Sequence, residues 1–412
     1  MTEKVTIVGA GIVGIFSALS LLEKGVLVEI VDADPPACGA SRGNAGVIAR
    51  WSCVPQSLPS LWRHIPGWLL NPEGPVAIRW RYLARFAPWA IKFLSANDKK
   101  ALPDTSDAML ALVRPNVELY RHHLKDTGQE NLVVDSKYVH VYRNPDDCDP
   151  NRIEWRLRAI RGVPFNVVKG EELFEIEPAL SRDIKAAMLI HDQARAMDPG
   201  AVGKALAEKA RKLGAHFRRE KVHALKPNSD DTWTLETDQG SSICSKVLLA
   251  AGAWSARLLK PLGISVPLEA ERGYHLVFRN PGITLINSIM DTDNKTVSSS
   301  MSAGVRCAGT AEFAGLDAPP DYHRARMLKN LNKRLFPKLN VEDPEEWMGS
   351  RPSFPDSLPV IGDTPRHKNL FVAFGHCHFG FSMAPNTGKV IAEIINNETP
   401  SIDIAPYRID RF

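Results

Sequence analysis

The sequence predicts an α/β protein, in which a discontinuous Rossmann-like, dinucleotide-binding domain is joined to a second α+β domain with a mixed or antiparallel sheet. Three observations support this fold class. A glycine-rich turn follows an apolar run near the start of the chain. Two further apolar runs occupy residues 247–251 and 370–374, and the long segments between these runs mix helical with period-two patterns. One nucleotide-binding sheet would thus take strands from the beginning, middle and end of the sequence.

The first element is the turn after the apolar residues 5–8, where Gly9, Gly11 and Gly14 have the spacing of a βαβ dinucleotide-binding unit. In such a unit the first glycine permits a tight turn, and the second lets a pyrophosphate approach the backbone. The third lets the helix pack closely on the strand. The N-terminus of that helix would then face the phosphates with free N–H groups.

The second strand of this unit is predicted over residues 27–32, after a helix that ends at Gly25. The strand ends at Asp32, at about the 20-residue interval where an acid hydrogen-bonds a ribose. The loop of residues 35–46 comes next and is rich in residues that expose backbone N–H groups. We expect this loop to lie along a diphosphate or a flat ring.

A helix is predicted from Asp198 to Gly214, because Asp198 is a suitable N-cap, Pro199 suits the first helical position and the glycine terminates the pattern. Alternating residues 232–237 predict a strand. The apolar run at 247–251 ends at Gly252 and predicts a buried central strand.

The remaining elements are a strand over 274–278, a basic amphipathic helix over 322–335, a buried strand over 370–374 and a last helix over about 385–396. From these patterns we predict two domains. The nucleotide-binding domain would comprise residues 1–52, 195–260 and 345–412, and the substrate-binding domain residues 53–194 and 261–344.

Composition limits the possible functions. The net charge of +4 is mild and gives no reason to expect nucleic acid as a partner. The six cysteines lie far apart without a CxxC pair, which argues against a zinc ribbon or a disulfide framework and favours a reducing compartment. No secretory signal pattern precedes the first strand, and no apolar run reaches the roughly 18 residues that span a bilayer. We therefore expect a cytoplasmic protein.

Residues 51–93 form an unusual segment, which holds five of the nine tryptophans together with several arginines. This mixture suits a surface at a membrane interface, where aromatic rings lie at headgroup level and arginines meet anionic lipid. It also suits an ordinary pair of amphipathic helices that covers the second domain. The sequence favours the second interpretation and leaves the first open.

Several motifs together resemble the D-amino-acid oxidase-like flavoproteins, and among these the bacterial D-amino-acid dehydrogenases. They occur in the order found in that family and cover almost the whole chain. The motifs occupy residues 9–14, 41–46, 177–180, 247–254, 272–274, 309–315, 347–352 and 375–380.

The resemblance implies that FAD is bound by the Rossmann-like domain. Non-covalent binding is expected, because the loop of residues 41–49 offers no histidine, and Cys307 and Cys377 are the remaining candidates for attachment. The residues expected to bind the cofactor are Gly9, Gly11, Ile12, Val13, Gly14, Asp32, Ala33, Ser41, Gly43, Asn44, Ala45, Val222, Ala251, Gly252, Trp254, Gly380, Phe381 and Ser382.

The resemblance also implies oxidation of a C–N bond in an amino acid, with the Cα hydride passing to flavin N5 and the amine unprotonated. Arg351 matches the arginine that binds the substrate carboxylate in this family, and a planar two-pronged donor suits that role. The alternative for Arg351 is a surface salt bridge. Tyr274 is expected to donate a second hydrogen bond to the carboxylate, although a buried core tyrosine is nearly as consistent with the sequence.

The loop of residues 375–382 leads into the last helix, whose N-terminus would stabilise negative charge on the reduced ring. Within it, His376 and His378 are candidates to line the pocket, to assist deprotonation of the amine or to bind a substrate hydroxyl. A metal site is not expected, because no third and fourth ligands lie nearby in sequence.

The leading functional hypothesis is a D-amino-acid dehydrogenase that passes electrons to a membrane quinone or another carrier. Its substrate would be a small amino acid, with D-proline or hydroxy-D-proline as one possibility. Two alternatives stay open: an oxygen-using oxidase of glycine or N-methyl amino acids, and a catalytically inert dinucleotide-binding sensor.

Overall fold

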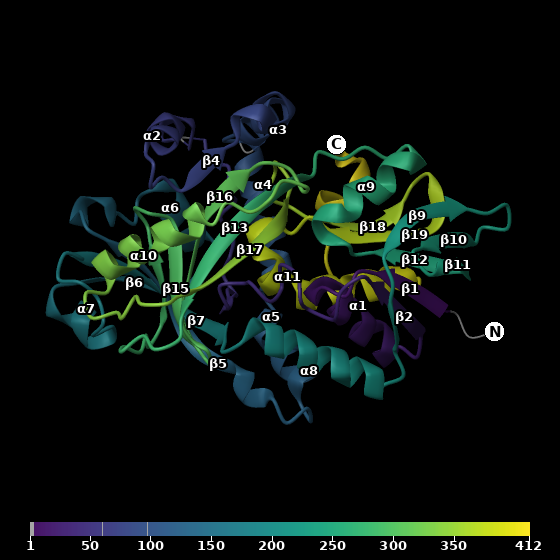
Figure 1. Cartoon of the computed structure of the whole chain (residues 1–412), viewed down its shortest axis with the longest axis horizontal. Coiled ribbons are helices and arrows are strands. Elements are labelled where there is room, and N and C mark those ends of the chain that lie inside the picture. The colour runs from purple at the N-terminus through teal and green to yellow at the C-terminus, as the bar shows by residue number, and fades with distance from the viewer. Residues whose placement is uncertain (1–3, 60, 97) are drawn as a thin grey trace.

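The computed structural model describes residues 4–59, 61–96 and 98–412. Two sheets lie side by side, with helices packed around them (Figure 1). The purple start of the chain and its yellow end meet in one half of the molecule, and green strands dominate the other half. The predicted α/β class is confirmed.

The first half contains a six-stranded sheet, in which every neighbouring pair is parallel except β18 with β19. Its central strands are buried and apolar, as expected for a parallel sheet covered on both faces. The prediction that distant segments build one sheet is therefore confirmed. In spatial order the strands are β18 (Val360–Thr364), β19 (His367–Phe374), β12 (Lys246–Leu249), β1 (Lys4–Val8), β2 (Leu27–Asp32) and β8 (His216–Arg219).

Three long helices pack together on this sheet, with α1 between the other two. At Gly388 an added Cβ would lie 2.5 Å from the backbone of Phe16, so a glycine is needed for the first and last helices to approach this closely. As predicted, Gly25 has a positive φ beyond the first helix, and the Asp198 side chain accepts a hydrogen bond from the Ala201 N–H at 3.0 Å. These helices are α1 (Ile12–Glu23), α8 (Pro199–Lys212) and α11 (Gly380–Ile395).

The second half contains a ten-stranded mixed sheet, in which a core of Val, Leu and Phe side chains lies beneath α10 (His323–Leu335). The strands along its main path are β17 (Glu345–Ser353), β13 (Glu269–Phe278), β16 (Gly304–Phe313), β15 (Thr296–Met301), β14 (Ser288–Asp291), β5 (Val133–Tyr142), β7 (Ala186–Ala196) and β3 (Val47–Ile48). β4 (Val76–Ile78) pairs with β16, and β6 (Phe165–Lys169) pairs with β7.

Smaller elements complete the fold. A three-stranded sheet is made of β9 (Val222–Pro227), β10 (Trp233–Thr237) and β11 (Gly240–Cys244). The remaining helices are α2 (Ile65–Leu70), α3 (Leu83–Ser95), α4 (Ala101–Val113), α5 (Asn116–Leu124), α6 (Ile153–Ile160), α7 (Glu171–Ile176) and α9 (Ser255–Leu259). Helices α2 and α3 protrude together at the top of the view (Figure 1).

The predicted domain boundaries need correction. β3 and β17 were assigned to the nucleotide-binding domain, but they form the two ends of the other sheet. Helices α4 and α5 were assigned to the second domain, but they pack against α11. No strand was predicted at residues 47–48 or 345–353, and a sequence pattern does not by itself reveal which sheet a strand joins.

The last helix begins at Gly380, five residues before the predicted start at 385. Proline lacks an N–H and normally breaks a helix, yet Pro385 lies inside this one. The carbonyl of Phe381, four residues earlier, instead accepts a hydrogen bond from the Tyr120 hydroxyl at 2.7 Å. A side chain from another helix thus replaces the missing bond.

Among the helices of the described residues, none combines the length and apolar character needed to cross a membrane.

Candidate active site

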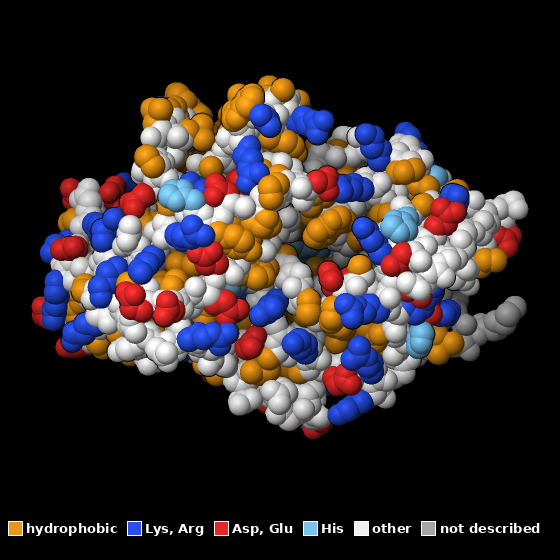
Figure 2. All heavy atoms as spheres, in the orientation of Figure 1, with side chains coloured by type: hydrophobic (Ala, Val, Ile, Leu, Met, Phe, Trp, Pro, Cys, Tyr) orange, Lys and Arg blue, Asp and Glu red, His pale blue; other side chains and the backbone are white. Residues whose placement is uncertain are grey.

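A cavity of about 1950 Å³ lies between the two sheets and is lined by residues of both. Ligand pockets for a single small molecule usually measure about 300–1,000 Å³. The volume is therefore sufficient for a dinucleotide and a second small molecule. In Figure 2 the surface is hollowed near the junction of the two halves.

The glycine turn has the geometry that a dinucleotide requires. Gly9 has a φ of +118°, and a Cβ there would lie 2.4 Å from the carbonyl oxygen of Ala250 on the neighbouring strand. A Cβ on Gly14 would lie 2.0 Å from the carbonyl oxygen of Gly9. A Cβ on Gly11 would make an ordinary contact with Ser41 Oγ at 3.6 Å. These three positions fit the roles of tight turn, backbone approach and helix packing.

Asp32 helps to fix this turn. One carboxylate oxygen accepts a hydrogen bond from the Ala10 N–H at 2.6 Å, and the other accepts one from the Asp34 N–H at 2.9 Å. Burial raises the pKa of Asp32, against the lowering effect of these backbone hydrogen bonds. Each carboxylate oxygen has two lone pairs, so a ribose hydroxyl can still donate to it.

The loop of residues 41–46 is held from behind by two side chains that the sequence analysis missed. His275 Nδ1 lies 3.1 Å from the Gly43 carbonyl oxygen. Arg306 Nη1 donates to the carbonyl oxygens of Arg42 at 2.9 Å and Asn44 at 2.7 Å. The N–H groups of Arg42, Asn44 and Gly46 bond within the loop, which leaves those of Gly43 and Ala45 for a ligand in the cavity. His275 lies in the strand predicted over 274–278, whereas no element was predicted at Arg306.

The predicted cofactor residues gather in this cavity. All of them except Gly14 line it, although they come from positions 9 to 382 of the chain. Gly14 lies behind the turn, where its role is packing. The individual contacts with FAD remain predictions.

Some predicted cofactor side chains also have structural roles. Ser41 Oγ accepts a hydrogen bond from the Ile12 N–H at 2.9 Å and so joins the loop to α1. Ser382 Oγ accepts one from the Ala49 N–H at 2.9 Å, which joins α11 to the end of β3. Both residues hold the cradle together in addition to lining it.

Arg351 lies on β17, with its guanidinium beneath the cavity. Its Nη1 donates to Glu271 Oε1 at 3.0 Å and to the Thr310 carbonyl oxygen at 3.2 Å. Its Nε and Nη2 bond to no other described residue, so one edge of the guanidinium remains available for a carboxylate. A Cβ at Gly273 would lie 2.1 Å from the guanidinium carbon, which explains the glycine in the 272–274 motif.

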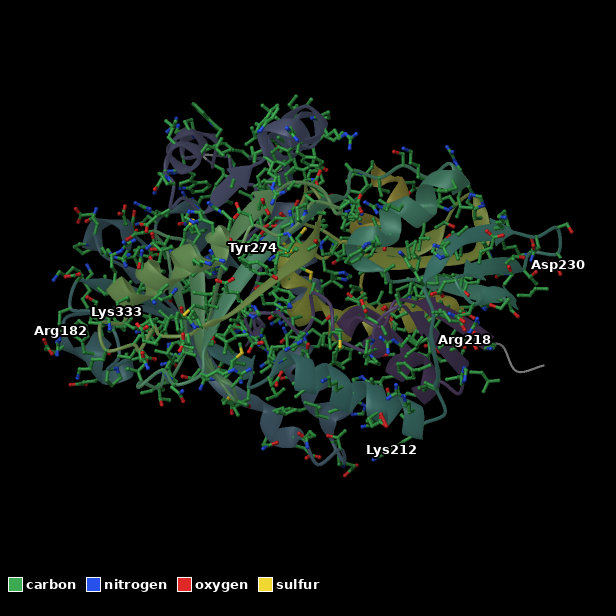
Figure 3. All side chains as sticks on the ribbon, in the orientation of Figure 1. Arg182, Lys212, Arg218, Asp230, Tyr274 and Lys333 are labelled. Atoms are coloured by element: carbon green, nitrogen blue, oxygen red, sulfur yellow. The ribbon has the colours of Figure 1, made fainter. Side chains whose placement is uncertain are left out.

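Tyr274 is placed differently from its predicted role. Its side chain is buried in the second domain (Figure 3), and its hydroxyl donates to Glu312 at 2.5 Å and accepts from the Asp321 N–H at 3.0 Å. Burial and the bond to Glu312 raise the pKa of Tyr274 to about 12. The hydroxyl is occupied, so the structure favours the core interpretation over a hydrogen bond to substrate.

The two histidines have different environments. His376 is buried, its Nε2 lies 3.0 Å from Thr387 Oγ1, and burial lowers its pKa to about 3. His376 thus lines the cavity as a neutral group that is held by Thr387. His378 is partly exposed to the cavity, and its Nε2 is in very short contact with Glu271 Oε1.

Glu271 on β13 connects Arg351 with His378, and it was not identified from the sequence. It is 4% exposed and contacts Arg351, His378 and Ser353. Burial opposes ionisation, but the charge and hydrogen bond of His378, together with Arg351, lower the pKa of Glu271 to about 2. The only signal in the sequence was an acid two residues before Gly273, just ahead of the strand predicted over 274–278.

The cysteines and metal candidates lie apart from this chemistry. Cys307 and Cys377 are buried, and burial raises the pKa of both thiols, to about 12 for Cys307. Protonated thiols are poor nucleophiles, which agrees with non-covalent FAD. Among the described residues, the one cluster with metal-ligand spacing is Glu23, His122 and His123, away from the cavity.

Comparisons with known proteins agree with this geometry. The family model described as DAO, FAD dependent oxidoreductase, matches residues 4–394. A D-amino-acid oxidase of Bradyrhizobium diazoefficiens is 36% identical, covering 99% of this chain and 98% of the relative. A D-amino acid dehydrogenase of Rhizobium rhizogenes is 29% identical, covering 99% of this chain and 100% of the relative. The structure of glycine oxidase from Geobacillus kaustophilus aligns over 100% of both chains with a TM-score of 0.76 and 24% identity. The chain therefore belongs to the DAO family of FAD-dependent oxidoreductases and uses FAD as its cofactor.

Proposed function

We propose that this protein oxidises the Cα–N bond of a D-amino acid to an imine, which hydrolyses to the 2-oxo acid. The observation that carries the proposal is Arg351, whose free guanidinium edge faces the cavity beside the dinucleotide cradle. The curated relatives named D-amino-acid oxidase and D-amino acid dehydrogenase support the D configuration. D-Proline and hydroxy-D-proline remain among the candidate substrates.

In this proposal Arg351 binds the substrate carboxylate through Nε and Nη2 and so fixes the position of Cα. Bound FAD supplies the two-electron acceptor, N5, for the Cα hydride. His378 Nε2 faces Glu271, which leaves Nδ1 as the atom that takes a proton from the substrate ammonium. Glu271 acts as a positioning residue, because its carboxylate orients the imidazole and stabilises the imidazolium that forms.

The direct test is anaerobic mixing of the yellow protein with matched D- and L-amino acids. Bleaching by D-alanine, D-proline or other D-enantiomers, without bleaching by the L-enantiomers, is the expected result. Bleaching by glycine and sarcosine alone would instead assign the alternative oxidase activity. If none of these compounds bleaches the flavin, the hypothesis that remains is the catalytically inert dinucleotide-binding sensor.

We further propose a quinone or another carrier as the electron acceptor, with the protein in the cytoplasm on the inner face of the membrane. Support comes from an apolar patch on the protruding α2–α3 region, which Figure 2 shows as two groups of hydrophobic side chains at the top of the molecule. Leu70 is 84% exposed and Trp80 is 78% exposed. The patch comprises Trp62, Leu69, Leu70, Trp80, Leu83, Ile91 and Leu94.

The charges around the apolar patch suit anionic lipid. Arg63 and Arg81 lie over the rings of Trp62 and Trp80, at 5.4 and 5.0 Å, and neither pairs with a carboxylate among the described residues. Burying a large apolar side chain contributes about 1.5–3 kcal/mol, and each arginine near an anionic surface about 1 kcal/mol. Leu69 and Leu94 of the patch also line the cavity, so a lipid-soluble acceptor would have a route from the bilayer to the cofactor.

We expect the protein to sediment with phosphatidylglycerol vesicles and less with phosphatidylcholine vesicles. Leu70→Ser with Trp80→Ser should weaken vesicle binding about 100-fold or more, since the pair supplies about 3 kcal/mol or more of burial. The control is Ile160→Ser with Ile243→Ser, which removes side chains that are 77% and 76% exposed elsewhere on the surface. Equal binding by both double variants, or no binding by the parent protein, would contradict the proposed membrane contact. Peroxide formation as fast as the reduction of an artificial dye would show that oxygen accepts the electrons. That result would contradict the proposal of a quinone or another carrier as the acceptor.

A further inference from the structure

A side lobe of the cavity lies between β5, β14 and α6 and has a different character from the cofactor cradle. It is lined by aromatic and basic groups, among them Tyr138, His140, Tyr142, Trp155, Arg158 and Lys295. The proposed chemistry at Arg351 uses none of these residues. The lobe therefore needs its own explanation.

Arg158 is the central residue of this lobe. It is 9% exposed, and no carboxylate lies within ion-pair distance of its guanidinium among the described residues. Its Nη1 donates to the Glu154 carbonyl oxygen at 3.1 Å, whereas its Nε has no partner. The guanidinium carbon lies 4.5 Å from the centre of the Trp155 ring. A buried cation without an anion is costly, so this position favours an anionic occupant.

Other buried arginines do not face the cavity. Arg195, Arg306 and Arg324 also lack a carboxylate within ion-pair distance among the described residues, but each donates to main-chain oxygens and none lines the cavity. Arg158 combines burial, an unpaired charge and cavity lining. The Nε2 atom of His140 in the same lobe is also buried without a hydrogen-bond partner.

The charged groups of the lobe balance in number. Among the described side chains that line it, Arg158, Lys295 and Glu154 take part in no ion pair. Arg152 pairs with Asp147, whereas Arg143 is shared by Asp291 and Asp293 and offsets only one of these two acids. The attraction for an anion therefore comes from the unpaired guanidinium of Arg158 and not from an overall positive charge. Coulombic attraction in such a partly dry site is stronger than in water.

The sheet register places this lobe along the direction of a substrate side chain. Ala308, Val297, Met290 and His140 occupy one row across β16, β15, β14 and β5, and all four line the cavity. Adjacent strands are about 4.8 Å apart, so this row covers about 14 Å. Thr310, two residues from Ala308, accepts the hydrogen bond from Arg351. Between Arg351 and Arg158 the cavity wall is thus formed by apolar side chains, those of Ala308, Val297 and Met290.

We propose that the lobe is a subsite for an anionic group at the end of the substrate side chain, so that the preferred substrates are D-amino acids with a second carboxylate. Arg158 would bind that carboxylate, and the apolar row would contact the methylenes between the two charged ends. This inference rests on the proposed oxidation of D-amino acids and specifies its substrate class.

The test compares kcat/KM, measured with an artificial electron acceptor, for acidic substrates and neutral substrates of matched length. D-Glutamate, D-2-aminoadipate and D-2-aminopimelate are set against D-glutamine, D-norleucine and D-2-aminoheptanoate. We expect at least one diacid to exceed its neutral match about tenfold, and the preferred length reports the spacing of the two arginines. In Arg158→Gln the ratio of kcat/KM for the diacid to kcat/KM for its neutral match should fall at least tenfold. Arg158→Lys should keep part of this preference. The matched control is Arg156→Gln, which changes an exposed arginine of the same helix.

A second measurement separates this inference from the proposed function. Calorimetry of the FAD-loaded protein should show tighter binding of adipate than of hexanoate, and Arg158→Gln should remove the difference. If adipate is preferred but no D-amino acid is oxidised, the subsite is supported and the proposed function fails. If neutral D-amino acids are oxidised as well as the diacids, or adipate and hexanoate bind equally, the subsite is overturned.

Discussion

Arg351→Ala is expected to lower kcat/KM roughly 30-fold to several thousandfold while FAD remains bound. The structure gives Arg351 one edge bonded to Glu271 and Thr310 and another edge facing the cavity, so its loss leaves a substrate carboxylate without its partner. Removing one member of a desolvated charge pair costs about 2–5 kcal/mol, which corresponds to that range. Steady-state kinetics with an artificial acceptor measures the change, and the flavin absorbance reports the cofactor.

Two further variants show whether the effect comes from carboxylate binding. Arg351→Lys keeps a positive charge beside Glu271 but has no planar pair of donors, so it should restore stability more than kcat/KM. Gly273→Ala should lower kcat/KM in the same way as Arg351→Ala, because the added Cβ would lie 2.1 Å from the guanidinium carbon of Arg351 and displace it. Unchanged kcat/KM in Arg351→Ala would refute the assignment of the substrate site.

Glu271→Gln is expected to lower kcat/KM about 10- to 100-fold near neutral pH and to move the acid limb of its pH profile to lower pH. Without the carboxylate the imidazolium of His378 is less stable, so His378 is a weaker base and loses its proton more readily. A matched control is Glu269→Gln, since Glu269 is a buried acid on the same strand that bonds to Tyr82. A pH profile in Glu271→Gln that coincides with that of the parent protein would exclude the proton-transfer role.

The same variant also tests stability against pH. The folded-state pKa of Glu271 is lowered to about 2, below the roughly 4.3 expected in an unfolded chain. The ionised carboxylate therefore stabilises the fold fully above about pH 4.3, and the contribution is lost as the pH falls toward 2. The Tm difference between parent and variant should be largest near neutral pH and shrink below pH 4. A constant difference would show that ionisation of Glu271 does not contribute.

The nucleotide-binding half was largely predictable from sequence, because its signals are local. Gly9, Gly14 and Asp32 work through the backbone of their own turn, so spacing along the chain identifies them. Apolar runs likewise identified the central strands. The domain assignment of residues 47–48 and 345–353 was wrong, because β3 and β17 pair with strands that lie far along the chain.

The substrate half was predicted less completely, because its roles depend on contacts between distant strands. Arg351 was recognised through a motif, but its neighbour Glu271 lies 80 residues away on an antiparallel strand. Tyr274 was assigned from its motif, and its bonds to Glu312 and to the Asp321 N–H show that the hydroxyl is occupied. Arg158 gave no signal at all, since an arginine on an amphipathic helix usually faces water.

The close pairing of the first and last helices has a consequence for how the protein is made. Strand β1 needs β12 as its neighbour, and α1 needs α11, whose Gly388 fits against Phe16. A nascent chain that has left the ribosome only as far as residue 360 lacks β19 and α11, so its early apolar segments stay uncovered. Flavin capture should therefore be a late, post-synthetic event, and shortening the carboxyl end by a few turns should yield aggregated, colourless protein.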